Sequence, residues 1–196
     1  MITRNEAEAR IAAGGTLSRS ELSEILRSPG DMTAGEMARL SAACPDWVAE
    51  QDTREAAMKE KEKRYLEEEA PLREELHRLG FPVKWVWDFV NAQDNYYVSA
   101  VPTLIDHLKR PYTDEIREGI ARSLAMKEAR GIAGAPIVEL LGESGLSDQL
   151  RWALANTLTT VAERSNRDAI KALLQTETNK DVADRLTRAL KTAARP

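Results

Sequence analysis

The chain has 196 residues, with 28 basic and 32 acidic side chains and a formal net charge of −4. Its hydrophobic share of 42% is enough for a core, which excludes a wholly disordered chain. A single cysteine, Cys44, excludes a disulfide framework, and the acidic balance argues against a general nucleic-acid binder. No run reaches the ~20 apolar residues of a membrane span, and no targeting segment is recognisable, so we expect a cytoplasmic protein.

Three short helices are expected before Pro45. Thr3, Ser18 and Thr33 are each followed, at the third position after them, by a glutamate. This is the pattern of a capping box, in which the hydroxyl and the carboxylate satisfy free backbone amides at the start of a helix. Large apolar residues are few here, so we expect these helices to depend on another part of the chain for a core.

A long charged helix is expected over about residues 46–70. Large apolar residues are almost absent between Ala49 and Arg64, and without an apolar heptad the helix should be largely solvated and weakly packed. Acid–base pairs at i,i+4, acid first, stabilise such a helix by ~0.2–0.5 kcal/mol each. There are three of them: Glu50–Arg54, Glu55–Lys59 and Glu60–Arg64. Pro71 can then open a second helix.

The two halves of the chain differ in charge. Residues 1–80 carry 12 basic and 17 acidic side chains, and residues 81–196 carry 16 and 15. We therefore divide the chain into a helical N-terminal region, 1–80, and a second domain, 81–196.

Residues 83–90 alternate like a strand, but no other segment offers a convincing partner strand. A buried helix is therefore expected here. Its aromatic residues Trp85, Trp87 and Phe89 should pack at the junction between the two halves.

A pattern of two helices recurs in the second half at an interval of about 34 residues, which is typical of helical repeats. The first helices begin at Val101-Pro102 and Ala135-Pro136, and the second helices at Asp114 and Asp148; a weaker copy starts at Ala169. Such units bury their apolar faces only against neighbours, which predicts a helical solenoid. The expected core consists of Leu104, Ile105, Leu108, Ile116, Ile120, Leu124, Val138, Leu141, Leu150, Leu154 and Leu158.

At these residues, over about 96–196, the chain resembles the HEAT-repeat family and related armadillo-like repeats. The resemblance rests on the Ala/Val-Pro-x-Leu-Ile start of the first helix and the Asp-x-x-Arg-x-x-x-Ala opening of the second. It implies an all-α, right-handed solenoid of helix pairs, here preceded by short helices and the long charged helix. It also implies that the second helices line a concave binding face, and that Arg117 and Arg151 form ion pairs within the stack.

On this alignment six residues lie on the concave face: Glu118, Arg122, Trp152, Asn156, Asp184 and Arg188. Trp152 beside polar residues has the composition of a binding hot spot, and the equal alternative is a tryptophan packed between helices. Mixed charge around one aromatic suits a protein partner better than a polyanion.

The leading hypothesis is therefore a non-enzymatic module that binds another protein, such as an adaptor, a chaperone or an immunity-type inhibitor. The first alternative is a nucleic-acid binder that resembles HEAT-like DNA glycosylases, and the second is an enzyme of unrecognised type. Catalytic motifs are lacking: no glycine-rich phosphate loop follows a strand, and His77 and His107 have no partner at metal-ligand spacing. Cys44 is expected to be a small buried residue. We expect no catalytic residue, no metal and no cofactor.

Overall fold

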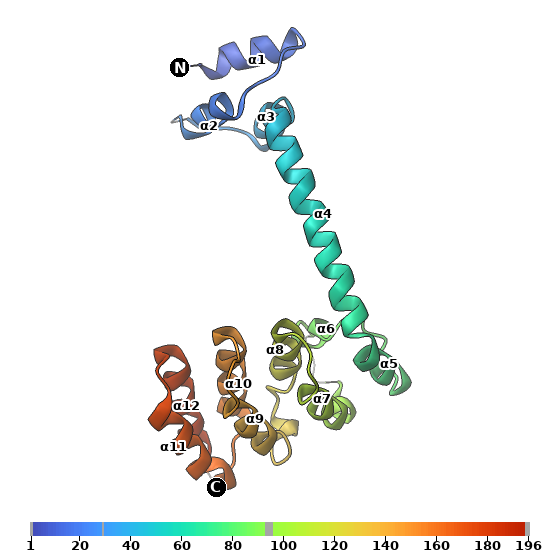
Figure 1. Cartoon of the computed structure of the whole chain (residues 1–196), viewed down its shortest axis with the longest axis vertical. Coiled ribbons are helices and arrows are strands. Elements are labelled where there is room, and N and C mark those ends of the chain that lie inside the picture. Colours follow the sequence, from blue (N-terminus) through green and yellow to red (C-terminus); the bar gives the residue numbers. More distant parts are fainter. Residues whose placement is uncertain (1, 29, 93–95, 195–196) are drawn as a thin grey trace. The chain divides into compact units, whose positions relative to one another are not determined.

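The computed structural model describes residues 2–28, 30–92 and 96–194. In these ranges the chain is all-α, with twelve α-helices and no strand (Figure 1). It divides into two compact units, Met1–Arg64 and Tyr65–Pro196. The expected all-α class is thereby confirmed. None of the helices in the described ranges combines the length and the apolar character needed to cross a bilayer.

The first unit contains α1 (Arg4–Ala12), α2 (Arg19–Arg27), α3 (Ala34–Ala42) and most of α4 (Pro45–Glu68). All three expected capping boxes are present, at Thr3, Ser18 and Thr33. Each hydroxyl accepts a hydrogen bond from the backbone amide of the capping-box glutamate, and that glutamate accepts one from the backbone amide of the cap. The unit has its own core of Ala7, Leu17, Leu22, Ile25, Leu40 and Cys44. The short helices therefore pack on one another, and the expectation that they depend on another part of the chain for a core is wrong. Cys44 is buried as expected.

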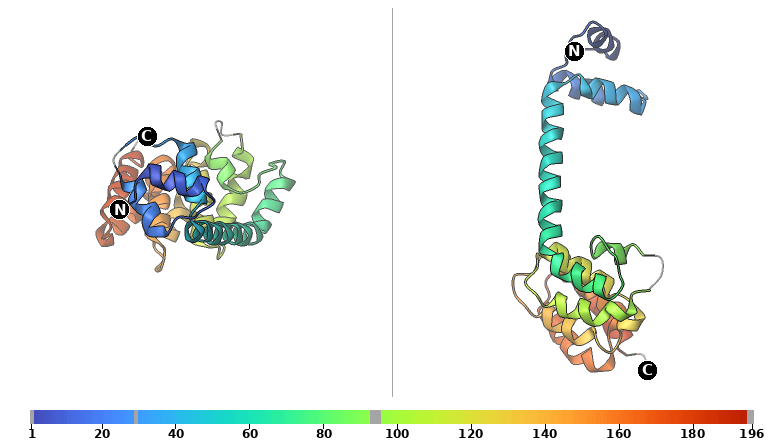
Figure 2. Two further views of the ribbon diagram at one scale, coloured as in Figure 1. Left: turned by 90° about the horizontal axis from the view of Figure 1, so that it is seen from above. Right: turned by 90° about the vertical axis from the view of Figure 1, so that its right-hand side faces the viewer.

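Helix α4 confirms the expected long charged helix. It is continuous (Figure 2), and none of residues 45–68, all of which the structure describes, is buried. The expected pairs Glu50–Arg54 and Glu55–Lys59 are formed, each at 2.5 Å. Glu50 also pairs with Arg19 of α2 at 2.6 Å.

The second unit contains the end of α4 and all later helices. These are α5 (Ala70–Arg78), α6 (Trp87–Val90), α7 (Val101–Leu108), α8 (Asp114–Ser123), α9 (Gly134–Leu141), α10 (Asp148–Val161), α11 (Arg167–Thr176) and α12 (Lys180–Thr192), with short 3₁₀ helices at Val98–Ala100, Lys127–Ala129 and Arg164–Asn166. The expected boundary near residue 80 lies inside this unit, because Leu72 and Leu76 of α5 belong to the same core as α7 and α8.

From α7 onward, helices that follow one another in the sequence pack against each other in pairs. α7 packs on α8, α9 on α10 and α11 on α12, and α10 also packs against both α8 and α12 (Figure 1). Of the core residues expected from the sequence, Ile105 and Val138 are partly buried and all the others are buried.

One arginine contact occurs twice in the second unit, at equivalent positions of two successive helix pairs. Arg117 of α8 donates from Nε to the last carbonyl of α7 at 3.4 Å, and its Nη2 lies 3.4 Å from Oε2 of Glu143. Arg151 of α10 donates from Nη1 to the last carbonyl of α9 at 3.2 Å and pairs with Glu177. Both arginines thus form ion pairs that tie one helix pair to the loop of the next.

The expected helix over 83–90 is shorter than predicted, since only its second half, α6, is helical. Two carboxylates accept hydrogen bonds from the backbone amides that precede α6. Asp88 Oδ2 accepts from the amide of Lys84 at 2.7 Å, and Glu69 Oε1 accepts from the amide of Val86 at 2.5 Å. These side chains supply the partners that an earlier helical turn would have supplied.

Of the aromatic residues expected here, Phe89 is buried and stacks on Tyr97 with ring centroids 4.1 Å apart. Trp85 and Trp87 are partly exposed. Trp87 lies against α8 at Gly119, where an added Cβ would come within 2.9 Å of the indole nitrogen. The missing side chain of Gly119 therefore lets α8 approach this segment closely.

Glu69 should make the stability of the second unit depend on pH. Burial raises the pKa of Glu69 to about 7 from 4.5, while the hydrogen bond from Val86 and the charge of Arg73 act in the opposite direction. Because the folded chain holds this proton more tightly than the unfolded chain, the free energy of unfolding should fall as pH rises from about 5 to about 8. The expected loss is on the order of 2 kcal/mol.

Urea unfolding of Glu69→Gln at both pH values tests this prediction. The amide keeps an accepting oxygen for Val86 but does not titrate, so this part of the pH dependence should disappear. Glu74→Gln, an exposed position on α5, is the control and should unfold like the parent protein. An unchanged slope of stability against pH in Glu69→Gln would contradict the prediction.

Candidate binding site

Two tryptophans and two arginines alternate across four helices of the second unit. The guanidinium carbon of Arg122 (α8) lies 5.8 Å from the ring centroid of Trp87 (α6) and 5.1 Å from that of Trp152 (α10). The guanidinium carbon of Arg185 (α12) lies 4.8 Å from the Trp152 ring. All three distances are within the ~6 Å over which a ring attracts a cation. We call these four residues the tryptophan–arginine ladder.

The position of Arg122 in the ladder is set by Glu118, one helical turn earlier. Glu118 Oε1 accepts from Nε of Arg122 at 2.8 Å and lies 2.7 Å from its Nη2. Side-chain exposure is 32% for Arg122 and 16% for Glu118, so the pair is partly shielded from water. Its charge is balanced locally, and the guanidinium plane is held beside the indole of Trp152.

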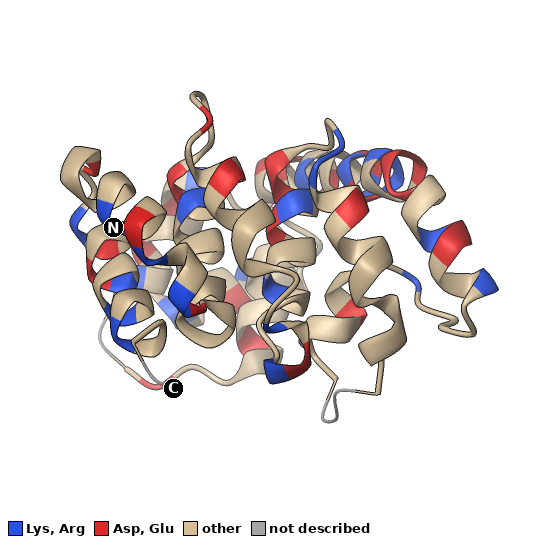
Figure 3. Cartoon of the chain, turned by 90° about the horizontal axis from the view of Figure 1, so that it is seen from below, with Lys and Arg blue, Asp and Glu red and all other residues tan. Residues whose placement is uncertain are grey.

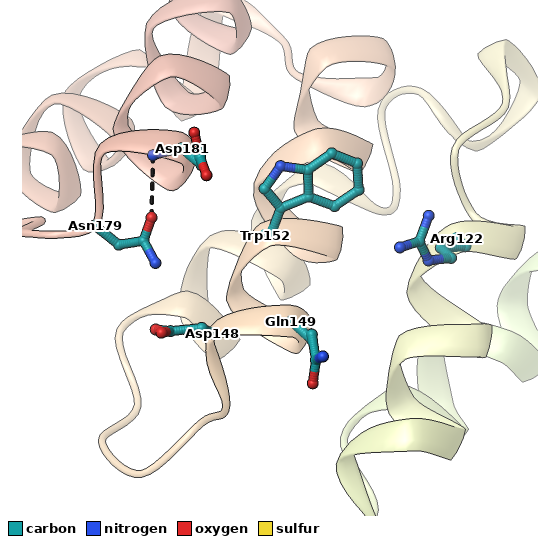
Figure 4. Close-up of a pocket in the computed structure, with 6 residues that line it drawn as sticks. All are labelled: Arg122, Asp148, Gln149, Trp152, Asn179 and Asp181. Atoms are coloured by element: carbon teal, nitrogen blue, oxygen red, sulfur yellow. Dashed lines mark hydrogen bonds between the residues drawn. The ribbon is translucent and has the colours of Figure 1, made fainter. Parts of the chain in front are cut away.

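A pocket of about 370 Å³ opens beside Trp152 (Figure 4). It is lined by Arg122, Asp148, Gln149, Trp152, Asn179 and Asp181. Figure 4 shows Arg122 on one side of the indole and Asn179 and Asp181 on the other, with Asp148 and Gln149 at the start of α10.

Two helix starts bring the polar side chains to this pocket. Ser147 caps α10 by accepting from the amide of Leu150, which places Asp148 and Gln149 in the first turn. Asn179 Oδ1 caps α12 by accepting from the amide of Asp181 at 3.0 Å. Its side-chain nitrogen makes no hydrogen bond within the described residues and remains a donor.

The pocket offers both signs of charge around one aromatic wall. Arg122 is balanced by Glu118, whereas the carboxylates of Asp148 and Asp181 are on exposed residues. The amides of Gln149 and Asn179 can donate and accept. This arrangement can hold a polar chain segment, including a basic side chain beside the two carboxylates.

The structure brings together three of the six residues expected on the binding face: Glu118, Arg122 and Trp152. Trp152 is partly exposed and also packs against the core, so its indole is neither fully buried between helices nor free of them. Asn156 is partly buried one turn further along α10, and Asp184 and Arg188 are exposed on α12. None of these three lines the pocket.

From α12, Asp181 lines the pocket and Arg185 lies over the Trp152 ring. Asp184 and Arg188 stand on the same stripe of the helix but do not line the pocket. Arg185 follows Arg151 by the same interval that separates Arg151 from Arg117, but that interval predicts a contact with the preceding helix of the pair and not with Trp152. Asp148, Gln149 and Asn179 carried no signal for the pocket, since their position depends on how the helix starts pack.

The histidine on α7 has a structural role. His107 is buried, and its Nδ1 lies 2.7 Å from the hydroxyl of Tyr112. Burial lowers the pKa of His107, against the effect of Glu75, whose Oε1 lies 3.2 Å from Nε2. In the described ranges no three histidine, cysteine, aspartate or glutamate side chains are grouped as a metal site requires.

The chain was compared with family models, with curated proteins and with solved structures. None of the three comparisons found a match. The function proposed below is therefore based on the side chains of this pocket.

Proposed function

We propose that the chain is a non-enzymatic module that binds another protein at the pocket beside Trp152. The observation that carries this proposal is the pocket itself, with an aromatic wall, a balanced arginine and two exposed carboxylates. Tryptophan and arginine are among the residues most enriched at the energetic centres of protein interfaces. Because the ladder holds both in place, little side-chain freedom would be lost on binding.

We further propose that α7 to α12 form a HEAT-like solenoid of three helix pairs. Support comes from the pairwise packing of these helices and from the carbonyl contact that Arg117 and Arg151 make at equivalent positions. In such a stack α8, α10 and α12 would line the concave face, which is the face a partner would enter. Three of the four ladder residues, Arg122, Trp152 and Arg185, belong to these helices.

The charge pattern favours a protein over a nucleic acid. Acidic and basic residues are interspersed along the helices (Figure 3). A polyanion binds by neutralising phosphates with a basic surface, and the carboxylates of Asp148 and Asp181 would repel it. A protein partner can satisfy both signs of charge in one orientation.

Site-specific photocrosslinking tests the proposal. A benzophenone amino acid at Gln149, an exposed residue of the pocket, should crosslink to a defined protein in the native host extract. The same group at Glu139, exposed on α9 and outside the pocket, should not. Purified single- and double-stranded oligonucleotides, titrated at low and high salt, should not bind tightly.

Each outcome decides between the hypotheses. A crosslinked protein that is specific to Gln149 and binds the purified chain supports the module. Salt-sensitive binding of an oligonucleotide that Arg122→Ala weakens would favour the nucleic-acid hypothesis instead. Equal crosslinking from both positions would contradict the assignment of the binding site to this pocket.

A further inference from the structure

Two aspartates begin equivalent helices of successive pairs, but only the first of them has a structural partner. Asp114, in the first turn of α8, accepts a hydrogen bond at Oδ2 from the amide of Ser147 at 2.7 Å and lies 3.9 Å from Nη1 of Arg117. Asp148 holds the same position in the first turn of α10. Its carboxylate makes no hydrogen bond and no ion pair within the described ranges.

The groups that would pair with Asp148 by analogy are taken by another carboxylate. Asn179 caps α12 as Ser147 caps α10, but its amide donates to Oε1 of Glu177 at 2.8 Å. Arg151, the arginine equivalent to that of α8, is also paired with Glu177. The charge of Asp148 is therefore left without a cation at the edge of the pocket.

Asp181 adds a second carboxylate without a cation. It is exposed, lines the same pocket from the first turn of α12, and pairs with no basic side chain among the residues that the structure describes. Asn179 already caps α12, so the Asp181 side chain is not needed there. Figure 4 shows both aspartates and Asn179 on one side of the indole, with Arg122 on the other. We call the part of the pocket at Asp148 and Asp181 its acidic side.

The opposite side of the pocket is basic, but its charge is balanced. Arg122 directs Nε and Nη2 to Glu118. Its Nη1 makes no hydrogen bond in the part of the chain that the structure describes and can donate to a ligand. The pocket thus presents two uncompensated negative charges on one side of an aromatic wall and a hydrogen-bond donor on the other.

We propose that the acidic side of the pocket holds the guanidinium group of an arginine on the partner protein, with Asp148 and Asp181 as its acceptors. Two carboxylates on separate helices suit a planar guanidinium, because its several N–H groups reach both acceptors at once, better than the compact ammonium of lysine. Nη1 of Arg122 would donate to a backbone carbonyl of the same segment. The inference rests on the proposed function, since it names the chemistry of the partner at the same pocket.

Titration of the full chain with short peptides tests the inference without the partner. The probe is Ala-Ala-Arg-Ala-Ala, acetylated and amidated so that the arginine carries its only charge. The control peptide has citrulline in place of arginine, which keeps the shape and removes the charge. The readout is the NMR signal of each tryptophan indole N–H in the ¹⁵N-labelled chain. Trp152 lines the pocket, whereas Trp47 and Trp85 lie outside it.

The arginine peptide should shift the Trp152 signal until it saturates and leave the signals of Trp47 and Trp85 unchanged. The citrulline peptide should bind at least about tenfold more weakly, because its hydrogen bonds to the carboxylates lose the assistance of charge. High salt should weaken binding of the arginine peptide for the same reason.

Asp148→Asn and Asp181→Asn should each weaken the arginine peptide about threefold, as the loss of an exposed ion pair does, and the double variant should weaken it further. Asp184→Asn is the matched control, because Asp184 is also an exposed aspartate of α12 but lies outside the pocket. It should bind like the parent protein. Two single variants are used so that a folding defect in one, seen in its circular dichroism, leaves the other to decide.

Three results would overturn the inference: no shift of Trp152 at millimolar arginine peptide, equal binding of the citrulline peptide, or equal affinity of the Asp184→Asn chain and the double variant. The proposed function fails separately. A protein that crosslinks at Gln149 and binds the double variant as tightly as the parent would support that function and overturn the inference. A chain that binds the arginine peptide but crosslinks to no protein would support the inferred chemistry and contradict the proposed function.

Discussion

Replacing Arg151 by methionine should lower the free energy of unfolding by about 3–5 kcal/mol, because it leaves a carboxylate buried without its partner. The side chain of Glu177, which pairs with Arg151, is only 4% exposed. Burial alone would raise the pKa of Glu177, but the hydrogen bonds from Arg151 and from the Asn179 amide hold it below its usual value. The stability that this carboxylate contributes is present above its unfolded pKa and is lost as pH falls through the folded pKa.

The repeat offers a matched control for this prediction. Arg117 makes the same carbonyl contact, but its partner Glu143 is 57% exposed and keeps its water when the arginine is removed. Arg117→Met should therefore cost only about 1 kcal/mol. The double variant Arg151→Met, Glu177→Leu should recover most of the loss, since no charge remains buried. Urea unfolding measures all three, and equal losses for Arg151→Met and Arg117→Met would contradict the argument.

Truncation of Trp152 to alanine should weaken binding of the partner captured at Gln149 by at least about 2 kcal/mol, which is roughly 30-fold in Kd. The indole forms the aromatic wall of the pocket and positions the guanidinium groups of Arg122 and Arg185. The same change should also lower the free energy of unfolding, by about 1–3 kcal/mol. This loss is smaller than the ~3–5 kcal/mol of a fully buried tryptophan, because Trp152 is partly exposed.

Binding and stability must be measured on the same folded variant. Isothermal calorimetry below the unfolding transition gives the affinity, and thermal unfolding gives the stability. Trp85→Ala is the matched control, since Trp85 is also partly exposed and also lies beside a cation, Lys84, but is outside the pocket. A Trp152→Ala variant that loses stability and keeps full affinity would make this tryptophan a packing residue.

Local sequence patterns predicted most of the helices. The capping boxes at Thr3, Ser18 and Thr33 form because the hydroxyl and the carboxylate that close them lie within one turn of the chain. The solvated helix α4 follows in the same way from neighbouring charges and the lack of apolar residues. Apolar spacing likewise marked the core of the second unit, where nearly all the expected residues are buried.

Contacts between distant residues decided the rest. Residues 84–86 are not helical, because the backbone amide of Val86 donates its hydrogen bond to Glu69, which lies far earlier in the chain. Asp184 was expected beside Trp152, but the side chain of α12 that lies over the indole is that of Arg185, the next residue. Which side chain of a helix meets its neighbour depends on how the two helices pack.

The amino-acid sequence by itself determined most of the helices, the solvation of α4 and the apolar residues that form the core of the second unit. These properties depend on groups within about one or two helical turns of each other. Only the tertiary structure decided that Trp152 lies beside Arg122 and Arg185 and that the starts of α10 and α12 meet at the pocket. Both features result from how separate helices pack against each other. A small rotation of one helix about its axis brings a different side chain to the site.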